Sequence, residues 1–235
     1  MSIRLLAFML LVVAGGASAV ESIEVVYGRG RNQVAIKLWT DAETALENDQ
    51  VELAAKDVDA ALRSDPGLYP ALYTRAKVYG LQGKFALVVQ DCTTALRADS
   101  TFVEAALLRA NANQQLRNYD ASLKEINHVI SIHPRIDGLA RAFEQRAWME
   151  ATCPNAGFRN GQKAIKDATM GCKLLNWRDE NGIDTLAAAY AEAGDFDSAL
   201  RYEQQALSAK DISVYDKRIY QAHLAMLKQH RPIRT

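Results

Sequence analysis

Cysteine, histidine and proline are scarce in this chain. Only three cysteines occur among 235 residues, at positions 92, 153 and 172, and their spacing matches no common zinc-binding pattern. The histidines lie near no Cys or carboxylate pattern in the sequence, so we expect exposed or half-buried helical positions for His128, His133, His223 and His230. The sequence therefore predicts no metal site and no cofactor.

An excess of either charge is also missing. Lys and Arg together number 28, as do Asp and Glu, so the formal net charge is zero. Without a basic excess the chain has no general electrostatic attraction for nucleic acid or for an anionic membrane surface, and we expect neither as a partner. The hydrophobic content of 49% is enough for one sizeable core.

No apolar run is long enough to span a bilayer as a helix, which takes about 20 residues. Residues 5–14 are apolar, follow Arg4 and precede Ala17, Ser18 and Ala19, which is the pattern of a secretory signal peptide over residues 1–19. No Cys follows the run, which argues against a lipid anchor. We expect a mature protein that begins at Val20, is periplasmic or secreted, and has no stable membrane insertion. The alternatives are an uncleaved anchor and a buried N-terminal helix.

Motifs of the common enzyme classes are absent as well. The chain contains no G-x-S-x-G, no G-x-x-x-x-G-K-[ST] and no H-E-x-x-H. The GRGR run at 28–31 lacks the later Gly and Lys of a phosphate loop, and we interpret residues 20–34 as a linker. Cys153 has no His close in sequence to activate it, and Pro154 more simply shapes a bend. We expect a protein that is not an enzyme, with a thiol-dependent enzyme as the weaker alternative.

A period of 34 residues organises most of the chain. The segments ALRSDP, ALRADS and VISIHP, at 61–66, 95–100 and 129–134, each begin 34 residues after the one before. We number each repeat so that residues 66, 100 and 134 stand at place 32. Small residues then recur at places 8 and 20, and turn-forming residues at place 15. Examples are Ala76 and Gly83 in one repeat, and Ala187, Gly194 and Ala199 in the repeat that starts at Glu180.

These residue sizes at these places resemble the tetratricopeptide repeat (TPR) over nearly all of residues 35–210. The resemblance implies an all-α fold, a TPR-type α-solenoid of about five helix-turn-helix units, with place 15 free to adopt positive φ. The first unit, 35–66, is degenerate, with Asp41 at place 7 and Asp49 at place 15. Residues 211–235 are expected to cap the stack, with an amphipathic helix at 214–229.

The fourth unit departs from the period. Its helices are expected at 139–152 and 161–175, with a turn at 153–160 several residues longer than usual. Residues 151–177 and 184–207 resemble a recurrent C-terminal segment of exported bacterial TPR proteins of unassigned function. Cys153 and Cys172 stand toward opposite ends of this antiparallel pair, beyond the ~7 Å that a disulfide allows between Cα atoms. Free buried thiols are therefore favoured over a disulfide, and Cys92 at place 24 is expected in the core.

The concave face of a TPR stack is lined by places 2, 5, 9, 12 and 13 of each unit. The uncharged amides at 111, 114 and 115 can donate to and accept from an extended peptide backbone. Large aromatic side chains flank them, and cations nearby can meet ligand carboxylates. The predicted partner-binding residues are Trp39, Tyr73, Lys77, Asn111, Gln114, Gln115, Arg141, Glu144, Trp148 and Asp184. The alternatives are a solvated groove of ordinary polar residues, and a Trp148 packed under the long turn.

The sequence therefore favours an exported scaffold that binds a partner protein or extended peptide in this groove. TPR domains that hold chaperone C-terminal tails use a carboxylate clamp, which needs Lys at place 5 and Asn at place 9 of the first unit. This chain has Trp39 and Glu43 there, so that clamp is absent. A structural subunit that forms a homodimer through its last helix is the alternative, with Ile219, Leu224 and Leu227 uncovered.

Overall fold

The computed structural model describes residues 32–210 and 212–234. Within these ranges the chain forms eleven α-helices and no strand, and the predicted all-α class with TPR-type helix-turn-helix repeats is confirmed. The helices group into two compact units that divide between Ala112 and Asn113, each with its own hydrophobic core. The predicted signal peptide, 1–19, and most of the predicted linker lie outside the described residues. A single superhelix over 35–210 stays a prediction.

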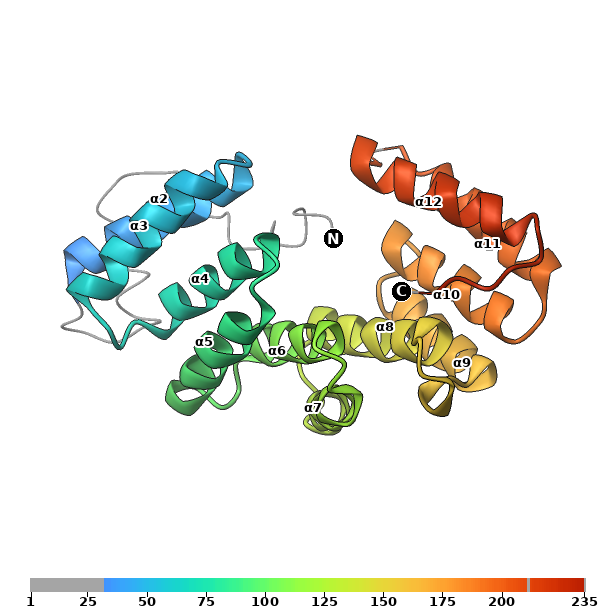
Figure 1. Ribbon diagram of the computed structural model, residues 1–235, viewed down its shortest axis with the longest axis horizontal. Coiled ribbons are helices and arrows are strands. Elements are labelled where there is room, and N and C mark those ends of the chain that lie inside the picture. Colours follow the sequence, from blue (N-terminus) through green and yellow to red (C-terminus); the bar gives the residue numbers. More distant parts are fainter. Residues whose placement is uncertain (1–31, 211, 235) are drawn as a thin grey trace. The chain divides into compact units, whose positions relative to one another are not determined.

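The first unit consists of two helix hairpins and the beginning of a third. Its helices are α2 (Gln33–Glu47), α3 (Val51–Ser64), α4 (Tyr69–Leu81), α5 (Phe85–Ala98) and the first part of α6 (Val103–Gln115). α2 pairs with α3, and α4 pairs with α5 (Figure 1). α4 also contacts α2 and α3, so each hairpin covers the apolar side of the other.

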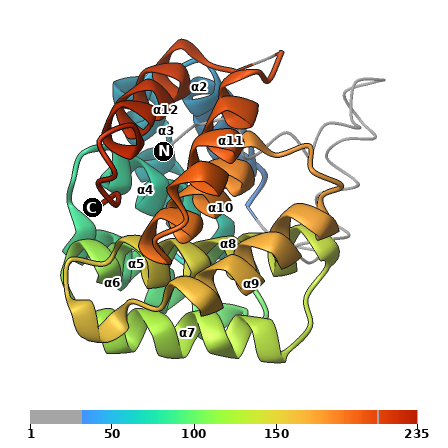
Figure 2. The ribbon, with the colours of Figure 1, turned by 90° about the vertical axis from the view of Figure 1, so that its right-hand side faces the viewer.

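The second unit contains the irregular repeat and the C-terminal helix. Its complete helices are α7 (Tyr119–Ser131), α8 (Ile136–Thr152), α9 (Gly161–Leu174), α10 (Glu180–Glu192), α11 (Phe196–Leu207) and α12 (Val214–Leu227). The long turn predicted at 153–160 is present and contains the 3-10 helix η2 (Ala156–Phe158). α10 contacts α8, α9 and α11, and α12 lies beside α11 (Figure 2).

Small residues lie where the paired helices approach each other. At place 8 of four repeats stand alanines, and at place 20 stand two alanines, a valine and a serine. All eight are fully buried: Ala42, Ala76, Ala110, Ala187, Ala54, Val88, Ser122 and Ala199. A larger side chain at these contacts would force the helix axes apart, so the TPR pattern is here a pattern of packing volumes.

Side-chain caps begin several helices of the second unit. Asn160 accepts from the backbone N–H of Lys163 at 3.0 Å, and Asp195 accepts from that of Ser198 at 3.0 Å. The hydroxyl of Ser213 accepts from the N–H of Asp216 at 3.0 Å. Each cap satisfies a backbone donor that has no partner within the helix, which stabilises a helix start by about 1 kcal/mol.

Place 15 has positive φ in all four repeats that follow the 34-residue numbering. The angles are 70° at Gly83 and 85° at Gly194, but also 58° at Asp49 and 61° at Arg117. A residue with a Cβ is strained in this region, whereas glycine is not. The chain therefore uses glycine at two of these turns and accepts local strain at the other two.

Arg117→Gly should raise the free energy of unfolding by about 1 kcal/mol, because it removes this strain. Arg117 is exposed, so little packing is lost with its side chain. Gly83→Ala at the same place of the preceding repeat should lower stability by a similar amount, since nothing crowds its Cβ and only the backbone angle opposes it. Urea unfolding followed by circular dichroism measures both, and two changes of the same sign would contradict this account.

The C-terminal helix covers the end of the second unit, as predicted. Leu227 is fully buried, and Ile219 is partly buried against the core. After the helix the chain turns back, buries Ile233, and places Arg234 against Glu192 at 2.5 Å. The alternative of a last helix that leaves Leu227 uncovered is contradicted, because the apolar side of α12 packs on its own unit.

Candidate functional site

In the first unit, the predicted inner-face residues of α2 and α4 contact one another. The Nζ of Lys77 donates to both carboxylate oxygens of Glu43, at 2.6 and 2.8 Å. The indole N–H of Trp39 donates to the hydroxyl of Thr74 at 2.9 Å, and that hydroxyl donates to Glu43. Places 5 and 9 of consecutive repeats therefore share one face, formed by first helices.

Two of the predicted partner-binding residues, Trp39 and Tyr73, are packed more tightly than a groove lining needs. Trp39 is 7% exposed and Tyr73 is 8% exposed. The Tyr73 ring lies 5.0 Å from that of Phe102, and Lys77 lies over it with the ammonium 5.2 Å from the ring centroid. The accessible polar groups of this face are therefore the Lys77–Glu43 pair, whose side chains are 14% and 23% exposed.

The three predicted amides lie on α6, which crosses from one unit to the other. Asn111, in the first unit, is half-buried. In the second unit, Gln114 donates to the hydroxyl of Ser122 at 3.1 Å, and Gln115 is exposed. These side chains retain hydrogen-bonding capacity at the surface, and their role in binding stays a prediction.

On α8, the predicted residues Arg141 and Glu144 are half-buried. Burial, together with the nearby negative charge of Asp179, holds the pKa of Glu144 well above its ordinary value, and Arg141 only partly opposes this. Its Oε1 has no hydrogen-bond partner among the described residues and lies against Gly171 and Gly182 of the neighbouring helices. Glu144 is therefore a packed side chain as well as a member of the predicted face.

Glu144→Gln should raise the free energy of unfolding at pH 8 by about 1 to 2 kcal/mol. The raised pKa means that the folded state favours the protonated acid: its contribution is complete below the ordinary value of 4.5 and is lost as pH rises through the folded-state pKa. Glutamine has the same shape without the charge, so its advantage should shrink toward pH 4.5. Urea unfolding at both pH values tests this, with exposed Glu47→Gln as the matched control, and equal effects of both substitutions would contradict it.

Asp184 and Trp148 meet the last helix. The Nδ1 of His223 lies 2.7 Å from Oδ1 of Asp184, and the imidazole ring lies 5.8 Å from the ring of Trp148. Asp184 is 6% exposed and His223 is 8% exposed. The expectation of an exposed or half-buried position was therefore wrong for His223, which is buried against a carboxylate that lies 39 residues away in the sequence. Trp148 packs beside this histidine, and Asp184 is hydrogen-bonded within the unit.

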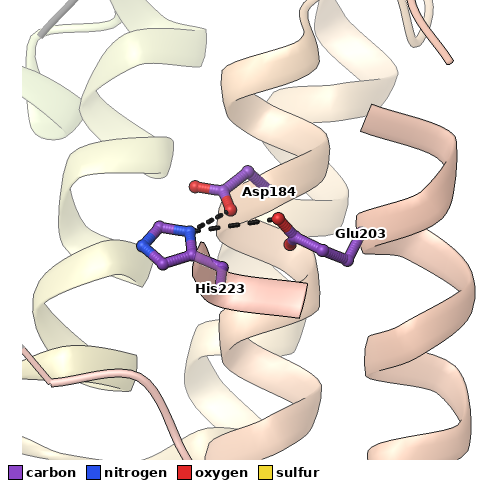
Figure 3. Close-up of side chains that lie close together, drawn as sticks. All are labelled: Asp184, Glu203 and His223. Carbon is purple, nitrogen blue, oxygen red and sulfur yellow. Dashed lines mark hydrogen bonds and ion pairs between the residues drawn. The ribbon is translucent and has the colours of Figure 1, made fainter. Parts of the chain in front are cut away.

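Glu203, which sequence reasoning missed, completes this group. It is fully buried on α11, with Oε1 4.0 Å from Nδ1 of His223 (Figure 3). Burial and the neighbouring Asp184 raise its pKa far above the ordinary range of a glutamate. Within 32–210 and 212–234, one set of three His, Cys, Asp or Glu side chains has ligand atoms close enough to hold a metal ion: Asp184, Glu203 and His223.

The three cysteines are free and buried, as favoured from the sequence. Cys172 lies in the core, where burial, with further contributions from the acids Glu144 and Asp179, raises the pKa of its thiol to about 12. A thiol with that pKa is protonated at neutral pH and is a poor nucleophile. Cys153 is 3% exposed, and its carbonyl accepts from Arg159 at 2.8 Å, which holds the long turn.

Among the described helices, none is both long and apolar enough to cross a membrane.

Comparison with known proteins connects this geometry to one fold. No family model matches the chain. The DnaJ protein P58IPK homolog B of Oryza sativa subsp. japonica is 23% identical over 193 residues, which cover 72% of this chain and 40% of that protein. The chain thus spans about two fifths of the length of this curated relative.

Solved structures extend the likeness to most of the chain. A thermophilic TPR protein of Thermus thermophilus superposes with a TM-score of 0.68 and 18% identity, over 82% of this chain and 99% of that one. YrrB, described as a TPR protein with an unusual peptide-binding site, gives a TM-score of 0.51 and 14% identity over 88% and 97%. With the helix hairpins, the buried small residues and the left-handed turns, these likenesses show that the chain has the fold of a tetratricopeptide-repeat protein.

Proposed function

We propose that this chain is a non-catalytic scaffold, exported from the cell, that binds a partner protein or an extended peptide on the inner face of its first helices. The observation that supports this most directly is the contact between Lys77 and Glu43, 34 residues apart, which puts corresponding places of consecutive repeats on one shared face. A face built from preformed helices loses little conformational freedom on binding. The likeness to YrrB, itself described by a peptide-binding site, agrees with this use of the fold.

The accessible amides and the ion pair indicate how an extended segment would be held. Asn111 and Gln115 offer donors and acceptors that match a peptide backbone, which gives affinity without strong sequence preference. Lys77 already has a carboxylate partner in Glu43, so an acidic ligand side chain would have to compete with an internal ion pair. We therefore expect main-chain recognition to contribute more than charge recognition.

The test is recovery of partners from an extract of the native host on the immobilised full chain. Asn111→Ala/Gln115→Ala should reduce recovery at least tenfold, because it removes the surface amides without touching the core. Gln90→Ala/Gln204→Ala is the matched control, since both residues are exposed on second helices. Substituting Tyr73 or Trp148 would be less informative, because both are packed in their units. Equal recovery by wild type and the Asn111/Gln115 variant would refute the proposed face.

Export rests on the signal-peptide pattern of residues 1–19. If the full chain is expressed in its host, intact-mass analysis should show a mature protein that begins at Val20, in the envelope or medium fraction. A cytosolic protein that retains Met1–Ala19 would contradict export while leaving the binding proposal open.

Self-association is the second candidate. At the start of α12, Val214 is 81% exposed and Tyr215 is 57% exposed, although most of the apolar side of the helix is covered. Light scattering of the full chain and of Val214→Asp/Tyr215→Ser tests this. A dimer that the double substitution dissociates would support it, and a wild-type monomer at high micromolar concentration would refute it.

A further inference from the structure

Three side chains from three successive helices converge inside the second unit. Asp184 comes from α10, Glu203 from α11 and His223 from α12 (Figure 3). One ligand atom from each lies within 4.8 Å of the other two, and all three residues are buried. The imidazole Nδ1 lies 2.7 Å from Oδ1 of Asp184 and 4.0 Å from Oε1 of Glu203, so the same nitrogen faces both carboxylates.

The group is incomplete as it stands. Glu203 has no exposed surface, and no donor group among the described residues serves its two carboxylate oxygens; its nearest polar neighbour, Asp184, is a second acid, which can bond to it only through a shared proton. Leaving a buried carboxyl group without a donor costs several kcal/mol if it is charged, and still costs free energy if it is neutral. Among the described residues, the one potential cation within ion-pair distance of Glu203 is His223, which already meets Asp184. A single imidazole, even when protonated, can offset the charge of only one of the two carboxylates.

We propose that Asp184, Glu203 and His223 bind a divalent transition-metal ion of the zinc class, with Nδ1 of His223 and one oxygen from each carboxylate as ligands. A divalent cation supplies the missing positive charge at the point that all three ligand atoms face. It also gives the oxygens of Glu203 a partner other than a second acid.

The donor set selects this class of metal. An imidazole with two carboxylates suits zinc and its neighbours, whereas calcium and magnesium prefer oxygen ligands alone. Around a tetrahedral zinc ion with bonds of about 2.0 to 2.2 Å, ligand atoms lie about 3.3 Å apart. The two separations from Nδ1, 2.7 and 4.0 Å, lie on either side of that value, so small side-chain rotations would suffice.

The site would fasten the last helix to the two helices that precede it. α12 is also held without metal, because the Tyr220 hydroxyl donates to the Asn181 side chain on α10 at 2.9 Å, and Leu227 is buried in the core. The metal-free chain should therefore fold and can be titrated. This inference does not depend on the proposed binding face.

The test is titration of chelator-treated full chain with ZnCl2, followed by calorimetry and by thermal unfolding. We expect a stoichiometry of about one and a rise in the unfolding temperature on binding. Glu203→Gln should weaken zinc binding at least about 100-fold, since it removes a ligand. Without metal the same variant should unfold at or above the wild-type temperature, because it removes an unpaired buried acid. The variant should thus unfold below wild type with zinc and at or above wild type without it, which separates a lost metal ligand from general damage to the fold.

The matched control is His128→Gln/His133→Gln, which removes two exposed histidines and should leave zinc binding unchanged. His223→Gln should also weaken zinc binding at least about 100-fold, since it removes the nitrogen ligand. The proposal is overturned if wild type binds no zinc, if Glu203→Gln binds as tightly as wild type, or if the exposed-histidine control loses the metal.

Discussion

Asp91→Ala should lower the free energy of unfolding of the first unit by about 3 kcal/mol. Asp91 lies on α5 with its side chain 6% exposed, and it accepts from Nε and Nη2 of Arg75 on α4 at 2.7 and 2.8 Å. This bidentate pair joins the two helices of one hairpin. Without the carboxylate, a guanidinium only 26% exposed would be left with Asp59 at 3.5 Å, which is itself 48% exposed.

The control separates the cost of an unpaired charge from the net contribution of the pair. Replacing both partners, as Arg75→Met/Asp91→Leu, should recover most of the lost stability, because apolar residues of similar volume leave no uncompensated charge. Urea unfolding of wild type, Arg75→Met, Asp91→Leu and the double variant gives the coupling free energy. If Asp91→Ala costs less than about 0.5 kcal/mol, the pair contributes no more than an ordinary surface contact.

The same pair recurs in the second unit. Arg146 on α8 donates to Asp167 on α9 at 2.6 and 3.0 Å. The partners are 16 residues apart in the regular hairpin and 21 apart in this one. The greater separation reflects the longer turn after α8. A search for Arg at place 7 with an acid at place 23, corrected for that turn, would have found both pairs from the sequence.

The repeat period predicted most of the fold because it reports packing volume. Ala42, Ala76 and Ala187 are small where helices touch, and that requirement can be read from residue type and spacing alone. The long turn was predicted because the period fails there. By contrast, residue type at Arg117 gives no sign of a positive φ. Only its position at place 15, where other repeats have glycine, indicates that angle.

The burial of the predicted face could not be inferred from the sequence, and its role in binding stays a prediction. Trp39 and Thr74, 35 residues apart, meet because place 5 of one repeat lies near place 6 of the next. Such contacts between repeats fill part of the face with its own side chains. Exposure therefore depends on how closely neighbouring first helices pack, which the identity of one residue does not reveal.

The Asp184, Glu203 and His223 group was missed for a different reason. His223 lies on α12, after the last full repeat, where the 34-residue numbering stops and its register to α10 is undefined. The contact spans 39 residues, longer than one period. Only the packing of α12 against its unit brings the imidazole to Asp184.

Gly161→Ala should destabilise the second unit by about 3 kcal/mol. Gly161 is the first residue of α9, after the long turn. The position that a Cβ would occupy there faces Ala193, at the C-terminal end of α10. A Cβ there would lie 2.5 Å from the backbone nitrogen of Ala193, 2.7 Å from its Cα and 2.9 Å from its Cβ. Backbone atoms at a helix end give way little, so α9 would have to shift away from α10 and open the core between them.

Two controls make the cause of this loss measurable. Gly157→Ala lies in the same turn but is exposed and would meet only the flexible Asn155 side chain at 3.4 Å, so it should change stability by less than about 0.5 kcal/mol. Adding Ala193→Gly to Gly161→Ala removes one of the three close contacts and leaves the two to backbone, so it should restore only a minor part of the stability. Complete rescue, or equal effects at positions 157 and 161, would show that the close approach of α9 to the α10 backbone is not what requires glycine.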